Sequence, residues 1–95
     1  MKKNKDLKML PTQKEMNELE SLFNSNLIDQ LELNTKKLII KYPKVPILFN
    51  ILGICLQKKN NLSEAIVNFN HAINIQPNFF LAYNNLGNIS KNLGK

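Results

Sequence analysis

The chain has 95 residues, of which 43% are hydrophobic and 21% are charged, and its formal net charge is +6. These values are typical of a globular chain, and no run approaches the roughly eighteen consecutive apolar residues of a membrane-spanning helix, so disordered and membrane-embedded proteins are excluded. The single cysteine, Cys55, excludes an internal disulfide framework and suits a reducing compartment, so we expect a cytoplasmic protein.

Residues 1–11 form a Lys-rich N-terminal tail with four lysines against Asp6. No other stretch is densely basic, and all 13 basic residues of the chain are lysines. Arginine supplies the two-pronged contacts that grip phosphate and read guanine edges, and the chain has none. The charge therefore predicts a solvated Lys-rich surface and no specific binding of nucleic acid.

Apolar residues at helical spacing predict five helices and no strand. Thr12 with Glu15, and Asn61 with Glu64, are typical of helix starts. In such a start the first side chain caps the helix, and a glutamate three residues later hydrogen-bonds back to the capping residue. The expected helices cover residues 12–24, 27–42, 46–59, 62–75 and 79–93.

Several residues recur with a period of 34, which is typical of a repeat architecture. The recurring positions are Pro43 and Pro77; Asn26, Asn60 and Gly94; Phe49 and Tyr83; and the pairs Leu52-Gly53 and Leu86-Gly87. Because Asn and Gly enter the left-handed conformation at low cost, the second set is expected to end helices there. The prolines close the second helix of each unit, and the two glycines inside helices predict close approach of a neighbouring helix.

Residues 46–79 resemble a complete tetratricopeptide repeat. The residues that carry the resemblance are Phe49, Leu52, Gly53, Ala65, Phe69, Ala72 and Pro77. Residues 80–95 resemble the first helix of a following repeat through Tyr83, Leu86 and Gly87, and residues 12–45 fit the same period as a divergent, capping repeat. The resemblance implies an all-α fold of antiparallel helix pairs, stacked as an α-solenoid of about two and a half units.

The C-terminal end falls where the second helix of a third repeat is expected to begin. The helix at 79–93 is then expected to present an apolar face without a partner helix. That face consists of Tyr83, Leu86, Ile89 and Leu93. We interpret the chain as an N-terminal fragment of a longer array, and the alternative is an edge that pairs with another subunit by self-association.

No set of residues predicts catalysis, a cofactor or a metal ion. Cys55 has no acid or second cysteine near it in sequence, and His71 is the only histidine. The acids Glu15, Glu18 and Glu20 crowd the start of a helix, where they favour the helix dipole. We therefore expect a buried thiol, a surface imidazole and a stabilised helix start, and no enzyme.

The remaining feature is the concave face that the first helices of stacked repeats line. Inward positions at the repeat spacing include Met16, Glu20, Ile47 and Leu81, and the predicted peptide-binding groove consists of Asn50, Ile54, Lys58, Asn84 and Asn88. Asn side chains both donate and accept, so this groove is expected to hydrogen-bond an extended peptide backbone, unless Asn merely fills exposed positions of an Asn-rich chain.

We therefore predict a protein- or peptide-binding interaction module. The alternative is the recognition arm of a larger enzyme, of glycosyltransferase, sulfotransferase or hydroxylase type, whose catalytic domain lies beyond Lys95. That alternative rests on analogy between folds and assigns no site to this chain.

Overall fold

The computed structural model describes residues 10–94, which form five helices and no strand. The helices are α2 (Gln13–Asn24), α3 (Ile28–Lys41), α4 (Pro46–Lys58), α5 (Leu62–Ile75) and α6 (Phe80–Leu93). Every helix end lies within one residue of the predicted position. The all-α class is confirmed, and all but the last two residues of the Lys-rich segment 1–11 fall outside the described residues.

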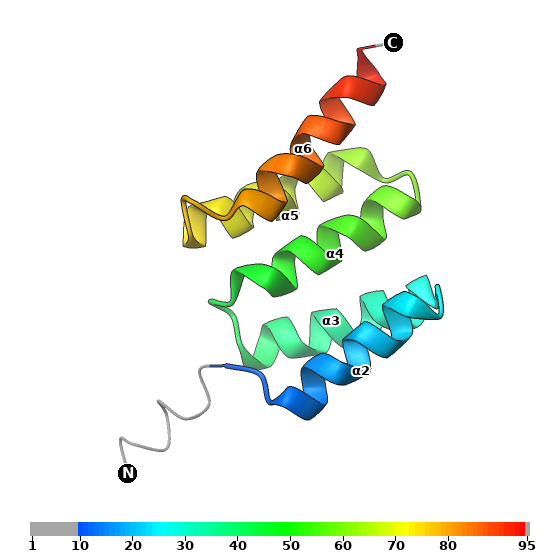
Figure 1. The fold of residues 1–95 in the computed structure, drawn as a ribbon, viewed down its shortest axis with the longest axis vertical. Coiled ribbons are helices and arrows are strands. Elements are labelled where there is room, and N and C mark those ends of the chain that lie inside the picture. The colour runs from blue at the N-terminus through cyan, green and yellow to red at the C-terminus, as the bar shows by residue number, and fades with distance from the viewer. Residues whose placement is uncertain (1–9, 95) are drawn as a thin grey trace.

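Four of the helices stack as two antiparallel pairs joined by short turns, and α6 follows as a fifth helix without a partner among the described residues (Figure 1). α2 packs against α3, and α4 packs against α5. The two pairs join through contacts between α3 and α4, and α6 packs on α5 and α4. In the view of Figure 1, α3 and α5 lie behind the first helices of the pairs, so α2, α4 and α6 share one face of the stack.

Two of the three predicted left-handed helix stops are confirmed. Asn26 and Asn60 have φ angles of 57° and 63°, and each follows the C-terminal end of the first helix of a pair. The prediction is wrong for Gly94, whose φ is −71°. The Gly94 N–H donates to the Ser90 carbonyl over 2.9 Å, so Gly94 continues the last helical turn instead of reversing it.

Both predicted helix starts are confirmed in position, since Thr12 and Asn61 precede the first residues of α2 and α5, but only Thr12 makes the predicted side-chain cap. Thr12 Oγ1 accepts from the Glu15 N–H over 3.0 Å, while a Glu15 carboxylate oxygen accepts from the Thr12 N–H over 2.8 Å. Asn61 makes no side-chain cap. Its amide donates instead to the Glu64 carboxylate over 3.1 Å, which draws it away from the backbone.

The two helical glycines differ in their surroundings. A Cβ at Gly53 would stand 2.5 Å from Cε1 of Phe69, so the predicted close approach of α5 to α4 is confirmed there. The same prediction is wrong for Gly87, where a Cβ would meet no heavy atom within 4 Å. No described helix covers that side of α6.

The core consists of two hydrophobic clusters on opposite sides of α4. One cluster joins α4 to α5 and α6 through Leu52, Leu56, Ala65, Phe69, Ala72, Ala82 and Ile89. The other joins α4 to the first pair through Leu19, Leu31, Tyr42, Val45, Leu48 and Cys55. The predicted bare face of α6 is correct only in part: Tyr83 and Leu93 are exposed, but Ile89 is buried because it packs on the first of these clusters.

Candidate binding groove

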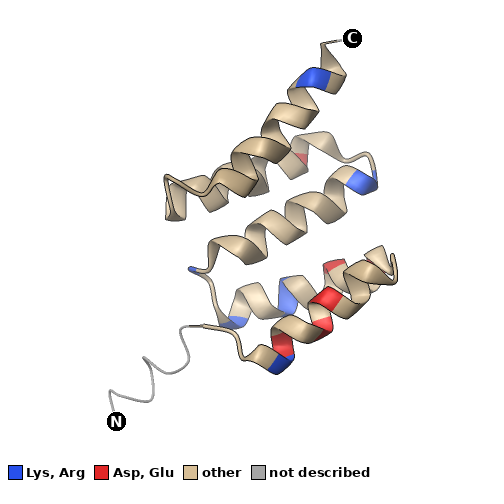
Figure 2. Cartoon of the chain, in the orientation of Figure 1, with Lys and Arg blue, Asp and Glu red and all other residues tan. Residues whose placement is uncertain are grey.

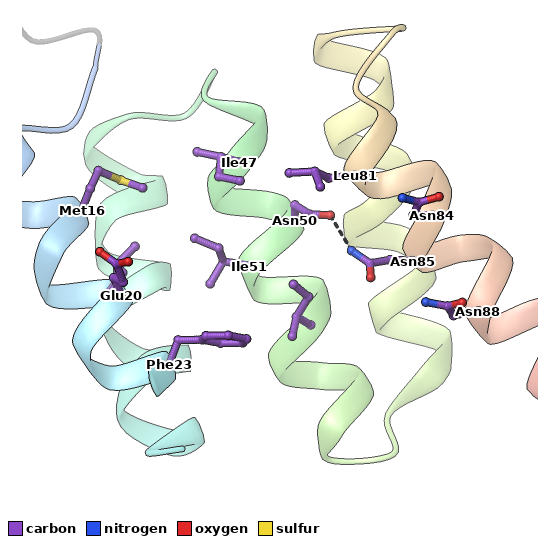
Figure 3. A pocket seen from close by; sticks show the side chains of 12 residues that line it. Met16, Glu20, Phe23, Ile47, Asn50, Ile51, Leu81, Asn84, Asn85 and Asn88 are labelled. Carbon is purple, nitrogen blue, oxygen red and sulfur yellow. Dashed lines mark hydrogen bonds between the residues drawn. The ribbon is translucent and has the colours of Figure 1, made fainter. Parts of the chain in front are cut away.

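A pocket of about 490 Å³ lies on the shared face of α2, α4 and α6 (Figure 3). We call it the binding groove. Its apolar wall consists of Met16, Leu19 and Phe23 from α2 and Ile47, Ile51 and Ile54 from α4. Its amide wall consists of Asn50 from α4 and Asn84, Asn85 and Asn88 from α6, and Leu81 and Glu20 complete the lining.

The spacing of the first helices explains where the groove opens. No Cα atom of α2 comes within 8 Å of a Cα atom of α4, whereas α4 and α6 approach within that distance. Side chains alone occupy the space between α2 and α4, and Phe23 and Ile51 point into it (Figure 3). The wide gap between α2 and α4 is therefore the apolar half of the groove, and the narrow gap between α4 and α6 is the amide half.

The amide half is closed by a hydrogen bond between the two helices. The Asn85 Nδ2 donates to Asn50 Oδ1 over 3.0 Å, and Asn50 is only 3% exposed. Asn50 was expected to offer both its donor and its acceptor to a peptide, but its oxygen is already used within the fold. Asn84 and Asn88 are exposed and line the groove, so their amides are open to solvent.

Four of the five predicted groove residues line the pocket, and Lys58 does not. Its ammonium lies 5.9 Å from the centroid of the Phe23 ring, at the end of α4 and outside the lining. Whether any of the five contacts a ligand stays a prediction. Sequence reasoning missed four lining residues, Leu19, Phe23, Ile51 and Asn85. Each lies three or four positions from a predicted inward residue. Residues at this spacing share one face of a helix, so the spacing could have identified them.

The charge of the groove comes from one residue. Glu20 is the single charged side chain of the lining, and among the described residues it forms no ion pair. α4 and α6 each carry a single charged residue, Lys58 and Lys91, in their last turns (Figure 2). The lining of the groove is therefore uncharged except for one carboxylate on α2.

Glu15, one turn earlier on α2, serves the fold. Its carboxylate accepts from the Thr12 N–H and from the Tyr42 hydroxyl, each over 2.8 Å, and from the Lys41 ammonium over 3.1 Å. The Thr12 bond, followed by the Tyr42 bond, lowers the pKa of Glu15 to about 2. Glu15 thereby ties the start of α2 to the end of α3 and positions one wall of the groove.

The described residues show no constellation for catalysis. Cys55 is fully buried, and burial raises the pKa of its thiol to about 11, so it is not a reactive thiolate at neutral pH. The His71 ring packs against the Phe49 ring at an interplanar angle of 38°, with ring centroids 4.1 Å apart. Within residues 10–94 no group of three or more His, Cys, Asp or Glu is placed to hold a metal ion, and no helix there is long and apolar enough to cross a membrane.

The comparisons with known proteins agree with the helical stack. Residues 56–94, from the last turn of α4 to the end of α6, match the family model described as TPR repeat. No curated protein and no solved structure matches the chain. The matched segment contains the Ala65, Phe69 and Ala72 positions that pack α5 against α4.

Proposed function

We propose that this chain, whose residues 56–94 match the model of the tetratricopeptide repeat, binds a peptide segment of another protein in the binding groove. Repeats of this family are protein-interaction modules, and stacked helix pairs offer concave surfaces for such contacts. The observation that carries the proposal is the pocket of about 490 Å³ on the shared face of α2, α4 and α6. The expected cytoplasmic location, without membrane or specific nucleic-acid binding, belongs to the same proposal.

The two halves of the groove suit different parts of a peptide. An apolar side chain gains free energy by leaving water for the gap between α2 and α4, where Phe23 and Ile51 surround it. The peptide backbone needs hydrogen-bond partners when it is bound, and the exposed amides of Asn84 and Asn88 supply donors and acceptors. A segment with an apolar anchor and an accessible backbone therefore matches both walls.

The groove is tested with fluorescein-labelled nine-residue peptides of Ala and Ser that carry one central Leu, titrated with the full chain. We expect binding that Phe23→Ala weakens by about five- to tenfold, because truncation removes part of the apolar wall. Phe80→Ala is the matched control, since Phe80 is 73% exposed and lies outside the groove. Absence of binding, or equal weakening by both substitutions, would overturn the proposal.

A second proposal concerns self-association through the uncovered side of α6. Phe80 and Tyr83 are 73% and 48% exposed, and the side of α6 at Gly87 has open space. Sedimentation equilibrium tests it: the chain should form dimers that Phe80→Ala weakens and Phe23→Ala does not. A monomer at every concentration would exclude this role of α6. The enzyme-arm alternative has no support among the described residues and is tested by sequencing the gene downstream of the Lys95 codon.

A further inference from the structure

The binding groove has a charge pattern that its general role as a peptide site does not explain. Its lining holds seven apolar side chains, four amides and one carboxylate, that of Glu20. Glu20 is exposed, and no described lysine lies within 4 Å of its carboxylate. The neighbouring acids are not available in the same way. The Glu15 carboxylate accepts hydrogen bonds from three donors within the chain, and Glu18 lines a separate, smaller pocket.

From this pattern we infer that the groove selects peptide segments in which one apolar side chain is accompanied by a single basic side chain, the apolar group between α2 and α4 and the cation at Glu20. The inference rests on the proposed function and adds the chemistry of the ligand to it. Glu20 stands three positions before Phe23 and four after Met16, on the α2 side of the apolar gap. A basic residue close in sequence to the apolar anchor therefore reaches the carboxylate.

The surrounding charges favour one cation and disfavour several. The chain carries a net charge of +6, and the ammonium of Lys58 lies over the Phe23 ring near the end of the groove. A strongly basic peptide meets this positive field at long range, while Glu20 offers a single opposite charge at short range. An acidic side chain has no cation in the groove lining to pair with. The order of affinity at Glu20 is therefore one basic residue first, a neutral residue second and an acidic residue last, because Glu20 repels a second carboxylate at short range, where the screened field of the chain is weaker.

The test uses the full chain and three sets of fluorescein-labelled nine-residue Ala/Ser peptides. Each peptide carries one Leu and, at a spacing of one to four residues, one Lys, one Gln or one Glu. At the best spacing the Lys peptide should bind about two- to fivefold more tightly than the Gln peptide, which is the size of a partly exposed ion pair. Glu20→Gln should abolish this preference, and Glu18→Gln, the matched control outside the groove, should leave it intact.

The outcomes separate this inference from the proposed function. If Leu peptides bind and Phe23→Ala weakens them, but the Lys and Gln peptides bind equally, the groove stands and the selection by Glu20 is wrong. The same conclusion follows if Glu20→Gln and Glu18→Gln reduce the preference equally, since the effect is then the general field of α2. If no Leu peptide binds, the proposed function and the inference both fail.

Discussion

The side-chain amide of Asn85 on α6 donates to the side-chain oxygen of Asn50 on α4 over 3.0 Å, and this bond closes the narrow side of the binding groove. Asn50 is 3% exposed, so its polar end sits where an unpartnered amide would be costly. The asparagines that line the groove therefore fall into two groups. Asn50 and Asn85 are hydrogen-bonded to each other between α4 and α6, whereas Asn84 and Asn88 are exposed.

Removing the Asn50 side chain should destabilise the fold. We expect Asn50→Ala to lower the free energy of unfolding by about 1 kcal/mol, since a hydrogen bond is lost and a small void is left between α4 and α6. Asn84→Ala is the control, because Asn84 is exposed and should change stability by less than about 0.5 kcal/mol. Urea unfolding followed by circular dichroism measures both. Equal stability of the two variants would show that the bond contributes nothing.

The two helical glycines should respond in opposite directions to alanine. At Gly53 a Cβ would stand 2.5 Å from the buried Phe69 ring, so Gly53→Ala should cost about 1–3 kcal/mol through overpacking. At Gly87 a Cβ meets no heavy atom within 4 Å, so Gly87→Ala should stabilise α6 by up to about 1 kcal/mol through its higher helix propensity. Thermal melts at low protein concentration compare the pair. Destabilisation by Gly87→Ala would mean that another helix packs on this side of α6.

Acid should weaken the link between α2 and α3 through Glu15. The pKa of Glu15 is lowered from 4.5 to about 2, so its ionised form stabilises the native state fully above about pH 4.5 and loses that effect as the pH falls towards 2. Glu15→Gln should therefore be less stable than the wild type at pH 6, with a difference that shrinks by pH 2. Glu18→Gln is the control on the same helix. If the difference in stability between Glu15→Gln and the wild type did not change with pH, ionisation of Glu15 would not be what stabilises the link between α2 and α3.

The left-handed turn at Asn60 predicts a difference between its alanine and glycine variants. Its φ of 63° is unfavourable for a residue with an ordinary Cβ, so Asn60→Ala should cost about 1 kcal/mol in the free energy of unfolding. Asn60→Gly should cost less, because glycine takes this conformation without strain. Chemical denaturation of the two variants decides the order, and an alanine variant at least as stable as the glycine variant would contradict it.

Helices and turns were predictable because they depend on local chemistry. The positions of Asn26, Asn60 and Thr12 set helix ends by conformational preference and capping, and these are properties of a few neighbouring residues. The left-handed stop at Gly94 and the side-chain cap at Asn61 were predicted wrongly, because each residue makes a different hydrogen bond within four positions. The 34-residue period made the stacking of the helix pairs predictable, because successive repeats pack on one another with the same geometry.

The site was predictable in outline only. Repeat spacing places Asn50, Ile54, Asn84 and Asn88 on one face, and all four line the groove. The unequal gaps on either side of α4 were not predictable, because they depend on how α2 rests against α3. The hydrogen bond between Asn85 and Asn50 was not predictable either. The repeat period implies the same spacing between α2 and α4 as between α4 and α6, whereas only the second pair is close enough for this bond.

The most direct test of the binding groove is a nuclear magnetic resonance titration of the ¹⁵N-labelled full chain with the Leu-bearing Ala/Ser peptide. Bound peptide should shift the amide signals of groove residues on α2, α4 and α6, such as Glu20, Ile51 and Asn88, and leave those of Val67 and Asn74 on α5 unchanged. Shifts confined to α3 and α5, or no shifts at millimolar peptide, would contradict the groove as the site of function.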